Sequence, residues 1–68
     1  MIDARGRSCP EPVIMIKKAM DTKENTYEMM VDSNVSVENV TRFARYNGYE
    51  AAVRQERDSF IIILTKKQ

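Results

Sequence analysis

The chain has 68 residues, with 11 basic and 10 acidic side chains, one Cys and no His. The lack of His excludes Cys–His and Ser–His–Asp catalysis and any imidazole metal site. The single Cys excludes an internal disulfide, a Cys-x-x-Cys redox pair and a zinc site built from thiolates of one chain. We therefore expect no metal and no cofactor, and Cys9 is the obvious candidate for covalent chemistry. The near-neutral charge gives no reason to expect a nucleic acid or a membrane as partner.

The first third of the chain predicts a short strand followed by a helix. Residues 1–5 alternate apolar and charged side chains, as strands do, and residues 6–8 turn the chain. A helix is expected from Pro10 to about Met20, because Pro is favoured at the first helical position, where its missing N–H would lack a partner anyway. The apolar stripe of this helix is Val13, Ile16 and Met20.

The middle third predicts a second strand and a second helix. The strand covers residues 27–31 and places alternate side chains, Tyr27, Met29 and Val31, on one face. The helix is expected from about Val35 or Ser36 to Asn47, with Gly48 suited to the position after its end. The candidate N-cap residues are Ser33, Asn34 and Ser36. The apolar stripe is Val37, Val40, Phe43 and Ala44.

The last third predicts two strands, over residues 49–55 and 60–65, joined by a turn at residues 57–59. A loop this short makes an antiparallel hairpin. The unbroken apolar run from Phe60 to Leu64 indicates a strand that is covered on both faces or is central in the sheet.

These elements predict a single domain, residues 1–68, of the α/β (α+β) class with the order β-α-β-α-β-β. A four-stranded mixed sheet would carry both helices on one face, because crossovers between parallel strands are right-handed. The result is a two-layer sandwich whose other sheet face is open to solvent or to a partner.

The segment from Cys9 to Pro12 is the feature that carries chemistry. If Pro10 is the first helical residue, Cys9 is the N-cap, where backbone N–H groups and the helix dipole stabilise a thiolate. The two prolines stiffen this turn and leave only the amides of Glu11 and Val13 near the sulfur. With no His and no second thiol, Cys9 would carry a group, accept one from a partner or sense redox state. The plainer alternative is a small, inert, buried side chain.

Residues 2–13, which end in the Cys-Pro-x-Pro of residues 9–12, resemble the signature of the TusA (SirA-like) sulfur-carrier family. The stretches 31–33, 37–42 and 48–50 resemble the YedF branch in particular, so the resemblance covers nearly the whole chain. It implies the same β-α-β-α-β-β two-layer fold. The family's usual apolar residue after the Gly is replaced here by Arg7, which adds positive charge beside the thiol.

The resemblance also implies a function. Cys9 would accept sulfur as a persulfide from a cysteine desulfurase or another donor and pass it to an acceptor protein, as a sulfurtransferase-type carrier rather than a stand-alone enzyme. Family roles include tRNA thiolation, sulfur oxidation and, for the YedF branch, selenium metabolism. The residues expected to support the thiol are Pro10, Glu11 and Pro12. The residues expected to dock partners are Arg5, Arg7, Lys17 and Lys18.

Alternatives stay open at this point. The chain is either a carrier, a non-enzymatic regulatory or interaction module in which Cys9 only caps a helix, or a selenium-handling carrier with the same thiol chemistry. YedF-type proteins can continue into a second, DsrE-like domain, so these residues are either a single-domain member or part of a longer chain. A lone thiol and an N-terminus without a secretory pattern lead us to expect a cytoplasmic protein.

Two tyrosines and nearby arginines offer a weaker candidate, a nucleic-acid patch. Acidic residues interleave with them, which favours a solvated surface instead. The residues concerned are Tyr46, Tyr49, Arg42, Arg45 and Arg54, with Glu38, Glu50 and Glu56 between them.

Overall fold

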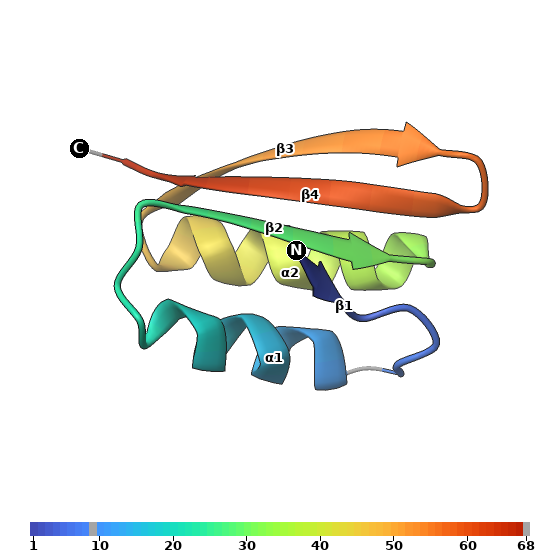
Figure 1. Cartoon of the computed structure of the whole chain (residues 1–68), viewed down its shortest axis with the longest axis horizontal. Coiled ribbons are helices and arrows are strands. Elements are labelled where there is room, and N and C mark those ends of the chain that lie inside the picture. The colour runs from blue at the N-terminus through green and yellow to red at the C-terminus, as the bar shows by residue number, and fades with distance from the viewer. Residues whose placement is uncertain (9, 68) are drawn as a thin grey trace.

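The computed structural model describes residues 1–8 and 10–67 and has the expected order of elements. In chain order they are β1 (Ile2–Asp3), α1 (Glu11–Met20), β2 (Thr26–Val31), α2 (Asn34–Tyr46), β3 (Tyr49–Glu56) and β4 (Ser59–Lys66). One sheet has the strand order β1-β2-β4-β3, with β1 parallel to β2 and the other pairs antiparallel. The helices form the second layer (Figure 1). The predicted α+β two-layer fold is confirmed.

The core lies between the helices and one face of the sheet. Across β2 and β4, Met29 lies opposite Ile62 and Tyr27 opposite Leu64, and residues paired in this way share a face. The helices add buried side chains from their apolar stripes, namely Ile16, Val40 and Ala44. The position of β4 between β2 and β3 explains its apolar run, because a central strand is packed against neighbours along both edges.

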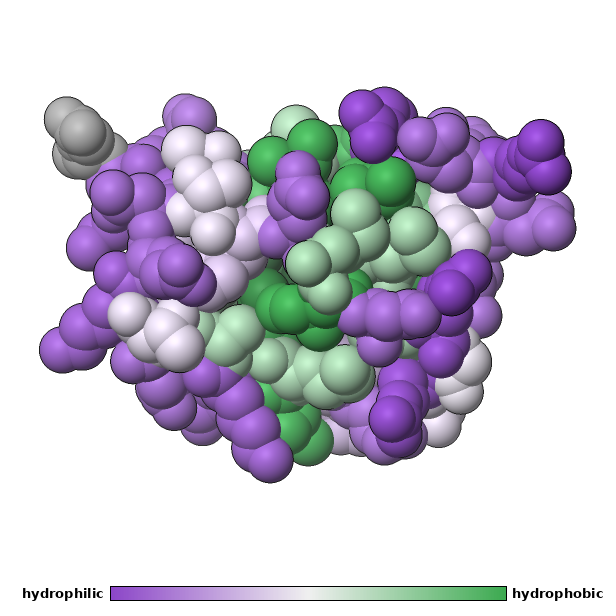
Figure 2. All heavy atoms as spheres, in the orientation of Figure 1, coloured by the Kyte–Doolittle hydropathy of each residue, from purple (hydrophilic) through white to green (hydrophobic). Residues whose placement is uncertain are grey.

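The opposite face of the sheet is less covered. Ile61 pairs with Met30 on one side and Arg54 on the other, and its side chain is buried although no helix lies over it. Figure 2 shows hydrophobic surface near the centre of the molecule, bordered by hydrophilic residues. The open face is therefore partly apolar and is shielded mainly by its own neighbouring side chains.

Several element ends differ slightly from the expected ones. Strand β1 stops at Asp3 because the chain turns between Ala4 and Arg7, where the Arg7 amide donates to the Ala4 carbonyl at 3.3 Å. Helix α2 begins at Asn34, because the Ser33 side chain caps it and accepts from the Ser36 amide at 3.1 Å. Ser33 is thus the N-cap among the three candidates.

Candidate functional site

The loop between β1 and α1 lies at the edge of the sheet where both parallel strands end. Connections that follow parallel strands leave from the same edge, so α1 and α2 both begin there (Figure 1). Helix N-termini carry partial positive charge, and two of them meet at this edge. The first turns are in contact across a small crevice lined by Pro10, Pro12, Val13, Ser36 and Asn39.

Cys9 itself lies outside the described residues, so the site is built from its neighbours in the chain. On the N-terminal side, residues 4–7 form a turn with Gly6 at its third position. Gly6 has a φ of +76°, which lies in the left-handed region that favours Gly. Its amide takes no part in the hydrogen bond that closes the turn and is therefore available to another element.

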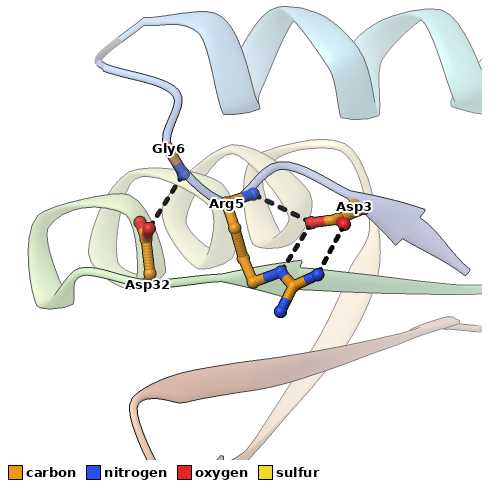
Figure 3. A network of polar contacts seen from close by, with 4 residues as sticks. All are labelled: Asp3, Arg5, Gly6 and Asp32. Atoms are coloured by element: carbon orange, nitrogen blue, oxygen red, sulfur yellow. Dashed lines mark hydrogen bonds and ion pairs between the residues drawn. The ribbon is translucent and has the colours of Figure 1, made fainter.

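The Gly6 amide donates to Oδ2 of Asp32 at 2.8 Å, as Figure 3 shows. Asp32 follows β2 directly and precedes the N-cap of α2, so this bond joins the loop to the junction of the neighbouring strand and helix. In the sequence, Asp32 stands out only as part of the stretch 31–33 that resembles the YedF branch. Its partner is 26 residues away, and only the parallel pairing of β1 with β2 shows that the two residues meet.

Asp3 and Arg5 form a close pair beside this turn. The Arg5 guanidinium donates from Nε to Oδ1 of Asp3 at 3.0 Å and from Nη2 to Oδ2 at 2.9 Å. The Arg5 amide donates to the same carboxylate at 3.1 Å. The side-chain hydrogen bonds, followed by the backbone one, lower the pKa of Asp3 to about 2, and Asp3 raises the pKa of Arg5. Arg5 is therefore held against its own strand (Figure 3).

Arg7 and Glu11 flank position 9 in the sequence and pair with each other. Their side chains are 3.5 Å apart and about half exposed. An ion pair this exposed contributes little to stability, but the opposite charges offset each other near the loop. The expected effects of Arg7 and Glu11 on a thiolate therefore partly cancel.

Lys17 and Lys18, the other two predicted docking residues, lie in the last turn of α1. At about 1.5 Å per residue they are roughly 10 Å along the helix from its start. Cations there also complement the helix dipole. The structure therefore places two of the four basic residues at the loop and two at the far end of α1, and their role in docking stays a prediction.

The start of α1 corrects one expectation. Pro10 is the N-cap, with φ −101° and ψ 20°, and the helix begins at Glu11 rather than at Pro10. The Glu11 amide donates to the Ser8 carbonyl at 2.8 Å, and the Pro10 carbonyl accepts the first helical bond from the Ile14 amide. The expectation that Cys9 is the N-cap is thus wrong, and the Glu11 amide is engaged by Ser8.

Of the three residues predicted to support the thiol, Pro12 has a clear role in packing. It occupies the first turn of α1 and is fully buried, against the start of α2. The apolar stripe predicted for α1 did not include it. A buried, rigid ring at this position fixes the direction in which the helix leaves the loop.

An open apolar groove adjoins the start of α1. Tyr46 of α2 stands at its side with 92% of its surface exposed, whereas Tyr49 is buried, so the two tyrosines do not share a surface. The groove is lined by Pro10, Val13, Asn39, Arg42, Phe43 and Tyr46. Within residues 1–8 and 10–67, no three acidic side chains gather closely enough to hold a metal ion. No helix in that part of the chain is both long and apolar enough to cross a bilayer.

Comparison with known proteins gives consistent matches. A family model described as sulfurtransferase TusA matches residues 1–67. A Methanocaldococcus jannaschii protein named as a candidate sulfur carrier is 37% identical over 68 residues, which is 97% of this chain and 91% of that protein. The crystal structure of a SirA-like protein from Desulfitobacterium hafniense has a TM-score of 0.85 and 28% identity, covering 98% of this chain and 96% of its own.

Proposed function

Because this chain belongs to the sulfurtransferase TusA family, which supports a sulfur-carrier role, we propose that it carries sulfur as a persulfide on Cys9. One observation carries the assignment to that residue. Cys9 is the only Cys in the chain, and its neighbours in the sequence, Ser8 and Pro10, lie between β1 and α1, at the edge where the N-termini of α1 and α2 meet. No other side chain of this sequence forms a persulfide.

The proposed reaction has two steps. In the first, the Cys9 thiolate attacks the terminal sulfur of a donor persulfide, a new S–S bond forms on Cys9, and the donor thiolate leaves and takes up a proton. In the second, an acceptor nucleophile attacks the terminal sulfur on Cys9, and the Cys9 thiolate leaves. An anion on Cys9 begins the first step and ends the second. The N-termini of α1 and α2 begin at this edge and carry partial positive charge, which favours an anion held near them.

The partners in this proposal are two proteins, a donor such as a cysteine desulfurase and a downstream acceptor. Lys17 and Lys18 have no ion pair within the described residues, so they are available to acidic groups of a partner. Arg5 and Arg7 would have to exchange their present carboxylate partners on docking. Placement in the YedF branch, a cytoplasmic location, and delivery to tRNA thiolation or to selenium metabolism remain parts of the proposal.

Mass spectrometry tests the assignment of the sulfur to Cys9. After incubation with a cysteine desulfurase and free cysteine, the wild-type chain should gain one sulfur atom that a reductant removes. Cys9→Ala and the closer replacement Cys9→Ser should gain none. Equal addition to Cys9→Ala, or no addition to the wild type, would overturn the proposal. A Cys9→Ser variant with full activity in cells would favour an interaction module instead.

A further inference from the structure

We infer that Asp32 is a positioning residue for sulfur transfer, because its carboxylate fixes the loop that leads to Cys9 through the amide of Gly6. The inference rests on the function proposed above and adds a residue that the motif around Cys9 does not contain.

The geometry of the contact is that of a strong hydrogen bond. The Asp32 carboxylate accepts from the Gly6 amide at 2.8 Å, and bonds to an ionised acceptor are shorter and stronger than neutral ones. In Figure 3 the Asp32 side chain extends from the end of β2 toward Gly6, while the Arg5 side chain turns back to Asp3. Asp32 is thus the carboxylate that reaches the loop from a neighbouring element.

Apart from the bond to Asp32, the hydrogen bonds and ion pairs that the structure describes for residues 5–8 are local. Arg5 bonds to Asp3, Arg7 bonds to Glu11, and the Ser8 carbonyl accepts from the Glu11 amide. Each of these joins the loop to the strand before it or the helix after it. Past Ala4, whose amide still pairs with β2, the bond to Asp32 is the one that ties the loop across to the β2–α2 junction.

The hydrogen bond between Asp32 and Gly6 lies where it can affect sulfur transfer without affecting the packing of the hydrophobic core. Asp32 is exposed and lies outside the hydrophobic core, so its loss leaves core packing intact. A protein donor must bring its own sulfur to a thiol in a defined orientation, and ordering a loose loop at that moment slows the reaction. A small alkylating reagent approaches from many directions and needs no such order.

The experiment compares Asp32→Ala with Asp32→Asn, whose amide oxygen accepts the same hydrogen bond without the charge. Four quantities are measured for each: sulfur uptake from a cysteine desulfurase, alkylation of Cys9 by iodoacetamide, deuterium exchange of the Gly6 amide, and thermal unfolding. Asp21→Ala is the matched control, because it removes an exposed carboxylate at the opposite end of α1.

For Asp32→Ala we expect sulfur uptake to slow by about tenfold, the change that corresponds to about 1.4 kcal/mol and to the loss of one good hydrogen bond. Alkylation should stay within about twofold of wild type, since the thiol chemistry is unchanged. The Gly6 amide should exchange faster. Asp32→Asn keeps a neutral and weaker bond to the Gly6 amide, so its sulfur uptake and its Gly6 exchange should lie between those of wild type and Asp32→Ala. Asp21→Ala should match wild type in all four measurements.

Other results overturn the inference. Wild-type sulfur uptake by Asp32→Ala would show that the tie is unnecessary, while the carrier function would stand. If Asp32→Asn takes up sulfur as slowly as Asp32→Ala while its Gly6 amide stays as protected as in wild type, the negative charge of Asp32 supports transfer and the hydrogen bond to Gly6 does not. A parallel fall in uptake, alkylation and melting temperature would mark a merely structural residue. No uptake by the wild type would remove the carrier function and this inference with it.

Discussion

Asp3 and Arg5 show how a single pair near the site responds to pH. The pKa of Asp3 is about 2 in the folded chain against 3.8 for an unperturbed Asp, because Arg5 donates to its ionised form. A lowered pKa means that the pair adds stability above the unfolded value, and that this contribution is lost as the pH falls from 3.8 toward 2. Since both side chains are more than half exposed, salt should weaken the effect.

We therefore predict that Asp3→Asn is less stable than wild type at about pH 5, and that the difference disappears as the pH approaches the folded pKa. Urea unfolding at a series of pH values, with and without added salt, measures this difference in the free energy of unfolding. Asp21→Ala again serves as the control for simple loss of a surface carboxylate. A difference between Asp3→Asn and wild type that is the same at every pH would contradict the predicted linkage.

At the scale of single residues, the sequence predicts which residues belong to the site better than it predicts the contacts that they make. Cys9 and the prolines around it are recognisable because the motif is contiguous and its residue types have few other uses. Asp32 is not recognisable, because an Asp after a strand is common and its bond to Gly6 depends on how β1 pairs with β2. The Glu11 amide was expected near the sulfur, but a one-residue shift of the helix start turns it toward Ser8.

Helix α2 is the element whose start bears most directly on the site, because it begins beside Asp32. The side chain of Ser33 accepts from the Ser36 amide at 3.1 Å, and the two hydroxyl groups are 2.9 Å apart. We predict that Ser33→Ala lowers the free energy of unfolding by about 1 kcal/mol, the usual cost of losing an N-cap.

Chemical denaturation measures this cost, and Ser33→Asp is the matched control, because its carboxylate can accept the same bond and also suits the helix N-terminus. Ser33→Asp should therefore stay close to wild type. Equal stability of Ser33→Ala and wild type would mean that Ser36 or solvent replaces the cap at no cost.

Periodicity predicts which face of an element is apolar, but it does not predict whether another element covers that face. In β3, Tyr49 and Val53 lie on the same face, yet Tyr49 is 7% exposed and Val53 is 45% exposed. The difference arises because Tyr49, close to the end of α2, is in ring contact with Tyr27 and bonds to Glu24, whereas Val53 lies further along the hairpin. The approximate extent of the helices and the hairpin of β3 and β4 could be inferred from local signals, while coverage depends on how far the helices reach.

The whole molecule divides into a packed half and the edge at which we propose that sulfur transfer takes place. The core uses the helix-facing side of β2 and β4, while the loop of Cys9 and the starts of both helices occupy the edge where β1 and β2 end. Loss of packing in the core should therefore act on the amount of folded protein, and loss of contacts at the edge should act on transfer. The two effects are separable by experiment.

Ile62 is the residue with which to test the packed half. It is fully buried in the central strand and lies between Met29 and Val53. Truncation of a buried Ile to Ala costs about 2–5 kcal/mol. A domain of this size has a total stability of about 3–10 kcal/mol. We predict that Ile62→Ala removes a large share of it, as measured by urea unfolding.

Ile63→Ala is the matched control, because Ile63 is the next residue of the same strand and is only partly buried on the open face. It should lose clearly less stability than Ile62→Ala, because fewer contacts are removed and the site remains open to water. At temperatures where both variants are folded, sulfur uptake should equal that of wild type. If both substitutions cost the same, the open face must be covered in solution, and the division between a packed and an open side of the sheet would be wrong.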